Sequence, residues 1–224
     1  MMKELSAIEV RILGSLMEKE LTTPEQYPLT LNALTNACNQ KSNRCPTVNY
    51  DMNEVKAAVE GLCSKTLAIG SDIPGSRVRK FRHFFTDRFK FVPAEAAILC
   101  ELLIRGPQTV GELRSHASRM HPFPELADVE RHLANLMDVS PPWVCLLPRQ
   151  PGKKEQRYMH LLMGEPDLAE LAEWEEERGA SATPSAAAGV LPGRVAQLEA
   201  EVVALRQELQ ILQEAFQQFR SQFE

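Results

Sequence analysis

An amide-rich stretch contains the side chains best suited to recognition chemistry. Residues 22–46 read TTPEQYPLTLNALTNACNQKSNRCP and lie between two apolar helical patterns. Polar groups are costly to bury without partners, so we expect them at the surface or within a hydrogen-bond network. Amides suit the base edge of adenine, and cations suit phosphate. The alternative is a helix followed by a capped surface loop. The candidates for nucleic-acid contact are Asn39, Gln40, Lys41, Asn43 and Arg44.

Two basic hairpins are the second possible source of contacts to nucleic acid. Each expected hairpin carries lysines and arginines near its turn, at matching places in the chain. Basic tips of this kind can grip phosphate groups. The alternative is a solvated hairpin whose charges protect an edge strand from pairing. The candidate residues are Arg77, Arg79, Lys80, Lys153, Lys154 and Arg157.

Residues that commonly perform covalent or metal chemistry do not cluster in this sequence. His116 and His121 are five positions apart, about 140° around a helix, so they cannot share a face. The 5 cysteines form no CxxC pair, and no spacing is typical of a zinc site. Neither common type of glycine-rich phosphate loop is present. We therefore expect no enzyme activity, no catalytic residues, no metal and no cofactor.

The elements that must position these candidates begin with three helices. Capping boxes open at Ser6 and at Asp51, and Thr30 can cap the helix between them. The first helix is expected to end near Glu20, ahead of a Thr-Thr-Pro sequence. A turn signal, Asp-Ile-Pro-Gly, then separates two short strand patterns. The strands are expected at 66–71 and 77–85.

The pattern then repeats. The segment 128–136 mirrors 54–62, and a further capping box opens at Thr109. A second hairpin is expected from strands at 143–148 and 156–162. Three helices followed by a hairpin is the order of a winged helix-turn-helix, and a double occurrence is hard to obtain by accident. The predicted fold class is mainly α with small β-hairpins, as two tandem winged helix-turn-helix domains at 1–90 and 91–163.

The remaining residues have a different composition. Residues 164–178 are acidic and expected to be helical, and residues 179–193 form an uncharged linker rich in Ala, Ser, Pro and Gly. Residues 194–224 have apolar side chains at alternating steps of three and four, which predicts a coiled-coil helix and a homodimer. The alternative is an amphipathic helix that folds back onto its own domain. The expected contact positions are Val195, Leu198, Val202, Leu205, Leu209, Leu212, Phe216 and Phe219.

Charge and hydropathy limit the possible surroundings. The 224 residues have a formal net charge of −5, with much of the acid in the tail. The apolar runs are too short to span a bilayer, and the N-terminus has no apolar leader. An odd number of cysteines without a leader fits reduced thiols. We therefore expect a cytoplasmic protein with no membrane partner.

The third helix of each repeat makes two functional hypotheses possible. Asp51, Glu54 and Glu60 outnumber Lys56 in the first of these helices, which is unfavourable for insertion into the major groove. The leading hypothesis is therefore a DNA-associated protein, a candidate regulator, that contacts DNA through its hairpins and the amide-rich loop. The rival is a scaffold for protein partners, like the tandem winged-helix subunits of chromosome-condensing complexes, that does not bind DNA directly.

Four passages resemble the YceH family of uncharacterised bacterial proteins. They are EKELTTPEQYPLTLNALTNACNQKSNRCP (18–46), GSRVRKFRH (75–83), LLIRGPQTVGELR (102–114) and LPRQPGKKEQRYMHLL (147–162). The resemblance covers nearly all of 1–163 and implies a tandem winged-helix fold. It implies no established activity, substrate or cofactor, and the heptad tail lies outside its motifs.

Overall fold

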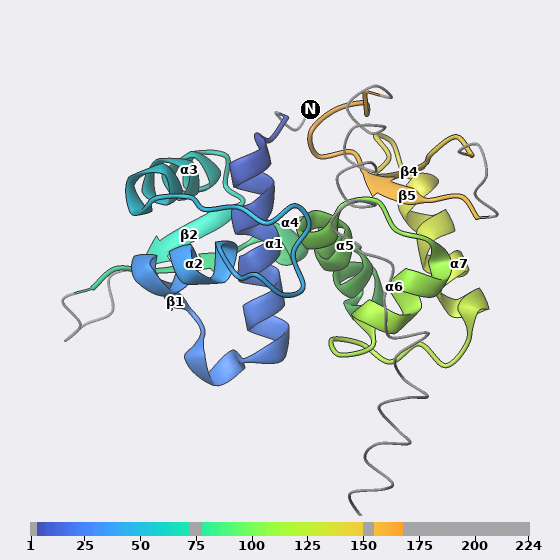
Figure 1. Cartoon of the computed structure of the whole chain (residues 1–224), viewed down its shortest axis with the longest axis horizontal. Coiled ribbons are helices and arrows are strands. Elements are labelled where there is room, and N and C mark those ends of the chain that lie inside the picture. The colour runs from blue at the N-terminus through green and yellow to red at the C-terminus, as the bar shows by residue number, and fades with distance from the viewer. Residues whose placement is uncertain (1–3, 72–77, 150–154, 168–224) are drawn as a thin grey trace, which may run out of the picture. The chain divides into compact units, whose positions relative to one another are not determined.

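The computed structural model describes residues 4–71, 78–149 and 155–167. These residues form a mixed α and β structure in which helices predominate (Figure 1). A short 3-10 turn, η1 (Pro24–Gln26), follows the first helix. The α-helices are α1 (Ala7–Thr22), α2 (Leu31–Cys38), α3 (Met52–Ser64), α4 (Phe85–Phe89), α5 (Pro93–Arg105), α6 (Val110–Ala117) and α7 (Leu126–Met137).

The expected caps start the helices. The Ser6 hydroxyl accepts a hydrogen bond from the Glu9 amide at 3.4 Å, and the Glu9 carboxylate accepts one from the Ser6 amide at 2.9 Å. The Asp51 carboxylate accepts from the amides of Asn53 and Glu54 at 2.7 and 2.9 Å. These bonds satisfy amides that have no partner within their own helix. Thr109 forms a third capping box, so all three predicted boxes are confirmed.

The strands form two antiparallel sheets. The first sheet has the order β1-β3-β2, and the second pairs β4 with β5. Phe81 of β3 lies opposite Leu29 on one side and Gly70 on the other, and its ring is buried. Gln108 pairs with Tyr158 just before α6, in the place that β1 has before α2. The strands are β1 (Leu29–Thr30), β2 (Ala68–Ser71), β3 (Lys80–His83), β4 (Val144–Leu146) and β5 (Tyr158–His160).

Both halves therefore contain three longer helices followed by an antiparallel strand pair. The stripe predicted for the third helices is confirmed, because Val55 and Val59 of α3 and Val129 and Leu133 of α7 are all 0% exposed. The sequence did not predict α4, which starts at Phe85 where the strand at 77–85 was expected to end. Phe85 is buried and its ring lies 5.5 Å from that of Trp143, so tertiary packing of aromatic side chains favours the helical turn.

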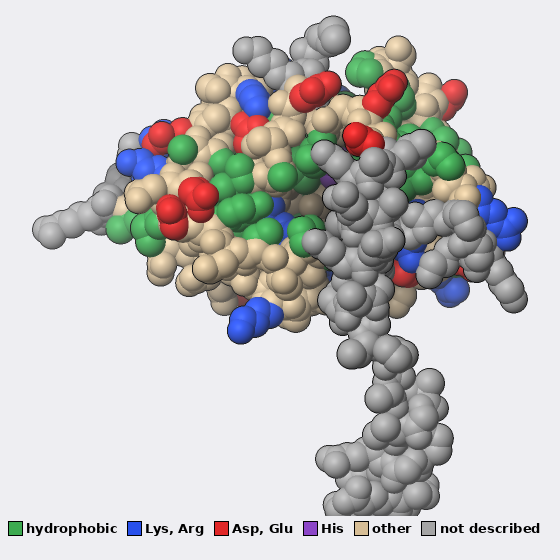
Figure 2. All heavy atoms as spheres, turned by 45° about the horizontal axis from the view of Figure 1, so that its top comes forward, with side chains coloured by type: hydrophobic (Ala, Val, Ile, Leu, Met, Phe, Trp, Pro, Cys, Tyr) green, Lys and Arg blue, Asp and Glu red, His purple; other side chains and the backbone are tan. Residues whose placement is uncertain are grey.

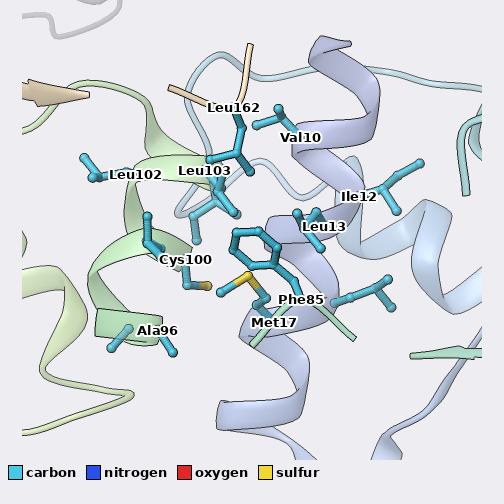
Figure 3. Packing of buried hydrophobic residues seen from close by; sticks show 14 of the residues in the cluster. Val10, Ile12, Leu13, Met17, Phe85, Ala96, Cys100, Leu102, Leu103 and Leu162 are labelled. Atoms are coloured by element: carbon cyan, nitrogen blue, oxygen red, sulfur yellow. The ribbon is translucent and has the colours of Figure 1, made fainter. Parts of the chain in front are cut away.

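The first helices of the two halves share one hydrophobic core. Helix α1 packs along α5, and a single cluster of buried side chains extends from one half into the other. Figure 3 shows Met17, Phe85 and Cys100 directed toward one another between these helices. The Cys100 Sγ lies 3.5 Å from the carbonyl oxygen of Gly14. All described residues belong to one compact unit, within which the predicted boundary at 90/91 falls between α4 and α5.

Two regions predicted at the C-terminal end lie largely outside the described residues. The predicted acidic helix at 164–178 lies mostly, and the linker and heptads of 179–224 wholly, outside the described residues. In the described part of the chain, no helix has the length and apolar character needed to cross a membrane.

Candidate nucleic-acid interface

The loop after α2 is held closed by Asn39. Its side-chain Nδ2 donates to the carbonyl of Tyr50 at 2.8 Å, and its Oδ1 accepts from the amide of Tyr50 at 2.9 Å. Asn39 is also the C-terminal cap of α2. The carboxamide thus uses a donor and its acceptor to join the two ends of the loop. A two-bond readout of adenine needs these same groups, so a base contact by Asn39 would require the loop hydrogen bonds to break.

Arg44 is buried, contrary to the expectation that it contacts phosphate. Its Nε and Nη2 donate to the carbonyl of Ala37 at 3.2 and 3.0 Å, which satisfies a carbonyl in the last turn of α2. Its Nη1 donates to Oε1 of Glu18 at 3.1 Å, and its Nη2 forms an ion pair with Oε2 of the same residue. With 0% of its side chain exposed, Arg44 has a structural role in this fold.

Asn43 is exposed, but its side chain is also engaged. Its Oδ1 accepts a hydrogen bond from Nη2 of Arg105 on α5, and its backbone carbonyl accepts one from Arg44 at 3.0 Å. Its φ of 59° lies in the left-handed region, which asparagine tolerates better than most residues. The local backbone therefore accounts for an asparagine here, and the side-chain oxygen that a base contact would use is engaged within the chain.

The loop and both halves meet in a network of buried charges. Glu18 of α1 pairs with Arg119, which follows α6, at 2.7 Å, and Arg119 pairs with Glu101 of α5 at 2.8 Å. Glu101 Oε2 lies 2.9 Å from Nε of Arg105, although neither atom is aligned for a hydrogen bond. We interpret this last contact as a charge contact without directionality. The network joins the amide-rich loop to the first helices of both repeats.

The protonation states in this network follow from burial and neighbours. Burial by itself would raise the pKa of Glu18, but hydrogen bonds and charge from Arg44 and Arg119 lower the pKa below its ordinary value. Arg11 of α1 donates to the carbonyl of Pro46 at the end of the loop, at 2.7 Å. Burial lowers the pKa of Arg11, and the nearby Arg44 lowers it further. Glu18 is therefore held as a carboxylate that compensates the buried Arg44 and also pairs with the partly exposed Arg119.

The described part of the first basic hairpin has one exposed and one half-buried cation near its turn. Arg79 is exposed, and its guanidinium lies 5.7 Å from the centroid of the Phe81 ring. Lys80, the first residue of β3, is half-buried, and Lys41 in the amide-rich loop is exposed. Gln40 beside it is half-buried. Arg77 lies outside the described residues.

In the second hairpin, the guanidinium of Arg157 binds other parts of the chain. Its Nη1 donates to the carbonyl of Pro107 at 3.0 Å and to the carboxylate of Glu112 at 2.6 Å. Glu112 also caps α6 by accepting from the Thr109 amide at 3.0 Å. Arg157, expected to contact phosphate, instead connects the residue before β5 to the start of α6 in this structure. Lys153 and Lys154 lie outside the described residues.

The third helices present acidic and apolar side chains to solvent. Met52 and Leu126, the first residues of α3 and α7, are each 46% exposed. Glu60 and Glu130 are exposed on the same two helices. Acidic, basic and apolar side chains are interspersed over the face seen in Figure 2. Carboxylates on such a helix would be repelled by the phosphates that flank the major groove, so insertion of these helices into the groove is unfavourable.

The described residues show no cluster suited to a metal ion, and their most buried cysteines are not activated as nucleophiles. Within 4–71, 78–149 and 155–167, no group of three or more His, Cys, Asp or Glu side chains could hold a metal ion. Burial raises the pKa of the Cys38 thiol to about 11 and that of Cys100 well above its usual value. Both thiols are therefore kept protonated, which makes them poor nucleophiles.

The charge network itself was not predicted. Its central residues, Glu18 and Glu101, lie on helices that are buried on nearly all sides, and each carboxylate is at most 1% exposed. A carboxylate inside an apolar helical run is the available signal, because a buried acid requires a partner. The sequence does not identify that partner, since Arg44 and Arg119 are distant along the chain.

The described fold and surface define a class: helical proteins built from a repeated unit of three helices and a strand pair, joined through a shared core. The chain belongs to the family described as "Protein of unknown function, DUF480", whose profile matches residues 5–153. It is 52% identical over 223 residues to a UPF0502 protein of Geobacter sulfurreducens, covering 98% of each chain.

Two further relatives are similar. A UPF0502 protein of Geotalea uraniireducens is 52% identical over 225 residues, covering 98% of each chain. A UPF0502 protein of Citrifermentans bemidjiense is 56% identical over 178 residues, or 80% of this chain and 82% of the relative. The resemblance thus extends in some relatives beyond the part matched by the family profile.

Proposed function

We propose that this chain is a cytoplasmic, non-enzymatic tandem winged-helix protein that associates with double-stranded DNA through exposed cations of its first half, and that it acts as a regulator. The observation that carries this proposal is the order α1-β1-α2-α3-β2-β3 with the sheet order β1-β3-β2. Helices followed by a strand pair in this order are typical of winged-helix DNA-binding modules. The motif resemblance to the YceH family adds to this interpretation.

The contact surface in this proposal is smaller than the sequence alone suggested. Lys41 and Arg79 are exposed, and Lys80 starts the strand that leads out of the first hairpin. Asn39, Asn43, Arg44 and Arg157 are left out because their polar groups bind other parts of the chain. Gln40 remains the candidate for a base contact. The sequence adds Arg77, Lys153 and Lys154 as further phosphate contacts.

Fluorescence anisotropy with a labelled mixed-sequence duplex tests this proposal. We expect binding at low salt that weakens steeply as salt rises, because phosphate contacts release counterions. The double variant Arg79→Glu with Lys80→Glu should weaken binding about tenfold and make the salt slope shallower by about 2, because it removes two cations that meet phosphate. The double variant Lys153→Glu with Lys154→Glu shows separately whether the second hairpin takes part.

The single hairpin variant Arg79→Glu has a matched control in Lys56→Glu, an equal change of charge on the exposed face of α3. Binding by the hairpin and loop predicts a smaller effect for this control than for the hairpin variant. Absence of binding at low salt with tens of micromolar protein would remove the proposal. An equal loss with Lys56→Glu would move the contact to the third helix.

A scaffold for protein partners is the second candidate function. It is favoured by Met52 and Leu126, which occupy matching positions at the start of the third helices and are each 46% exposed. Exposed apolar side chains at equivalent places in both repeats suit protein contact better than DNA contact. A pull-down from the native cell, with and without nuclease, separates the candidates. Partners that bind through DNA should be lost after nuclease treatment, whereas direct protein partners should remain. The double variant Met52→Glu with Leu126→Glu should remove the direct partners.

A further inference from the structure

A pocket of about 480 Å³ lies where the end of α1, the end of β3, α4 and the first turn of α5 meet. Its size is within the usual range for small-molecule sites. Met17, Leu21 and Phe91 give it an apolar lining. The pocket draws on both repeats, since Pro93 and Ala96 belong to α5. Neither Lys41 nor Arg79, which carry the proposed DNA contact, lines this pocket.

Charged groups of both signs line this pocket. Asp87 of α4 and Lys90, which ends α4, are exposed, and within the described residues neither side chain makes a hydrogen bond or an ion pair. Glu20 also lines the pocket, and its Oε2 lies 2.6 Å from Nε2 of His83. The pocket therefore offers one carboxylate and one lysine without partners in the described residues, beside a second carboxylate that already contacts His83.

His83 provides an independent sign of an unfilled polar site. Its side chain lines the pocket and is only 2% exposed. Its Nδ1 is buried and has no hydrogen-bond partner in the described part of the chain. Buried polar atoms are usually satisfied, so an orphan of this kind indicates a missing partner.

The start of α5 favours an anionic group near Lys90. The N-cap position is Val92, whose side chain cannot accept a hydrogen bond, and Pro93 follows as the first helical residue. The Val92 amide donates to the Glu95 carboxylate at 3.4 Å. The amides of Ala94 and Glu95 in this first turn therefore lack a side-chain acceptor at the cap. Helix N-termini attract carboxylates through such amides and through the helix dipole.

We propose that this pocket binds a zwitterionic amino acid with an apolar side chain. The ligand's ammonium lies at the carboxylates of Asp87 and Glu20. Its carboxylate lies toward Lys90 and the first turn of α5, and its side chain packs against the apolar wall formed by Leu21 and Phe91. This combination of two opposite charges around an apolar floor distinguishes the site from one for a simple anion or a simple amine. It does not depend on DNA binding.

Isothermal titration calorimetry with L-leucine as the probe tests the proposal. Two analogues each lack one charged group: isocaproate has no ammonium, and isoamylamine has no carboxylate. We expect L-leucine to bind with saturation and each analogue to bind at least tenfold more weakly. No saturable binding of L-leucine at millimolar concentration, or equal binding of an analogue, would overturn the assignment.

Two variants assign the charges within the site. Asp87→Asn should weaken L-leucine binding about tenfold and leave isocaproate binding unchanged, because that analogue has no ammonium. Lys90→Met should weaken L-leucine binding similarly and leave isoamylamine binding unchanged. Glu60→Gln, an exposed carboxylate on α3, is the control. Circular dichroism confirms that each variant is folded, and L-leucine binding unaffected by both pocket variants would place the ligand elsewhere.

Discussion

Arg44 and Glu18 are both removed from solvent, with side-chain exposures of 0% and 1%. A buried ion pair adds little net stability compared with a well-packed apolar pair, but loss of one partner leaves an uncompensated charge. In this protein the pair also satisfies the carbonyl of Ala37 and receives Arg119 from the second half. At the residue scale, the pair therefore acts chiefly by fixing how the loop after α2 lies against α1.

Replacement of Arg44 tests this structural role. Arg44→Met should lower the free energy of unfolding by about 3 kcal/mol, because Glu18 loses one of two arginine partners and the Ala37 carbonyl loses its donors. Lys41→Met, an exposed position in the same loop, is the matched control and should change stability by no more than about 0.5 kcal/mol. Urea unfolding measures both, and a fully stable Arg44 variant would contradict the buried role.

His160 is expected to make stability depend on pH. Burial lowers its pKa from 6.5 to about 4, so the folded state prefers neutral imidazole. Stability is therefore complete above the unfolded-state pKa and is lost as pH falls from 6.5 toward 4, by up to about 3 kcal/mol. Urea unfolding at pH 7.5 and pH 5 should show this loss. In His160→Gln the difference between the two pH values should shrink, and an unchanged difference would assign it to other groups.

At the element scale, the caps and the aliphatic stripes follow directly from local sequence. Ser6, Asp51 and Thr109 each form the capping box that their sequences predict, because the donor and acceptor lie three residues apart. The small strand β1 was missed, since a two-residue strand has no periodicity of its own and depends on Phe81 across the sheet. The same holds for the turn α4, which depends on Trp143.

The crossing of α1 and α5 gives a test at this scale. A Cβ added at Gly14 would lie 2.7 Å from Cγ2 of Ile104 and 2.9 Å from Cβ of Leu103. Gly14→Ala should therefore destabilise the fold by about 1–3 kcal/mol despite the better helix propensity of alanine. Gly111→Ala is the control, because its nearest heavy atom would be 3.9 Å away. The control should be neutral or slightly more stable in urea unfolding; equal effects would refute the close approach.

At the scale of the whole molecule, the two repeats share one core and do not form two separately packed domains. The buried cluster is continuous between them, and Arg119 of the second half pairs with Glu18 of the first. The amide-rich loop takes part through Asn43 and Arg105. Local unfolding of one repeat would therefore expose apolar surface and buried charge of the other, which favours cooperative unfolding of the described residues.

The heptad pattern of 194–224 leads to a prediction for the full chain. Apolar residues at steps of three and four suit a seam between two helices, so we expect a homodimer. Deletion of residues 190–224 should convert the dimer to a monomer, as measured by light scattering. The double change Leu205→Glu with Leu209→Glu in the full-length chain should have the same effect. A mass that both changes leave unaltered would defeat this prediction.

The sequence by itself determined the repeated helices, their caps and the apolar stripes, because these depend on residues only three or four positions apart. It also placed the polar loop and the basic hairpins. Only the tertiary structure decided which polar residues face inward. Asn39, Arg44 and Arg157 have side chains that would suit a ligand equally well, and their partners Tyr50, Glu18 and Glu112 are 11, 26 and 45 positions away. Local sequence cannot specify contacts over such distances, since they form only when the loop after α2 closes against α1 and the second strand pair lies against the start of α6.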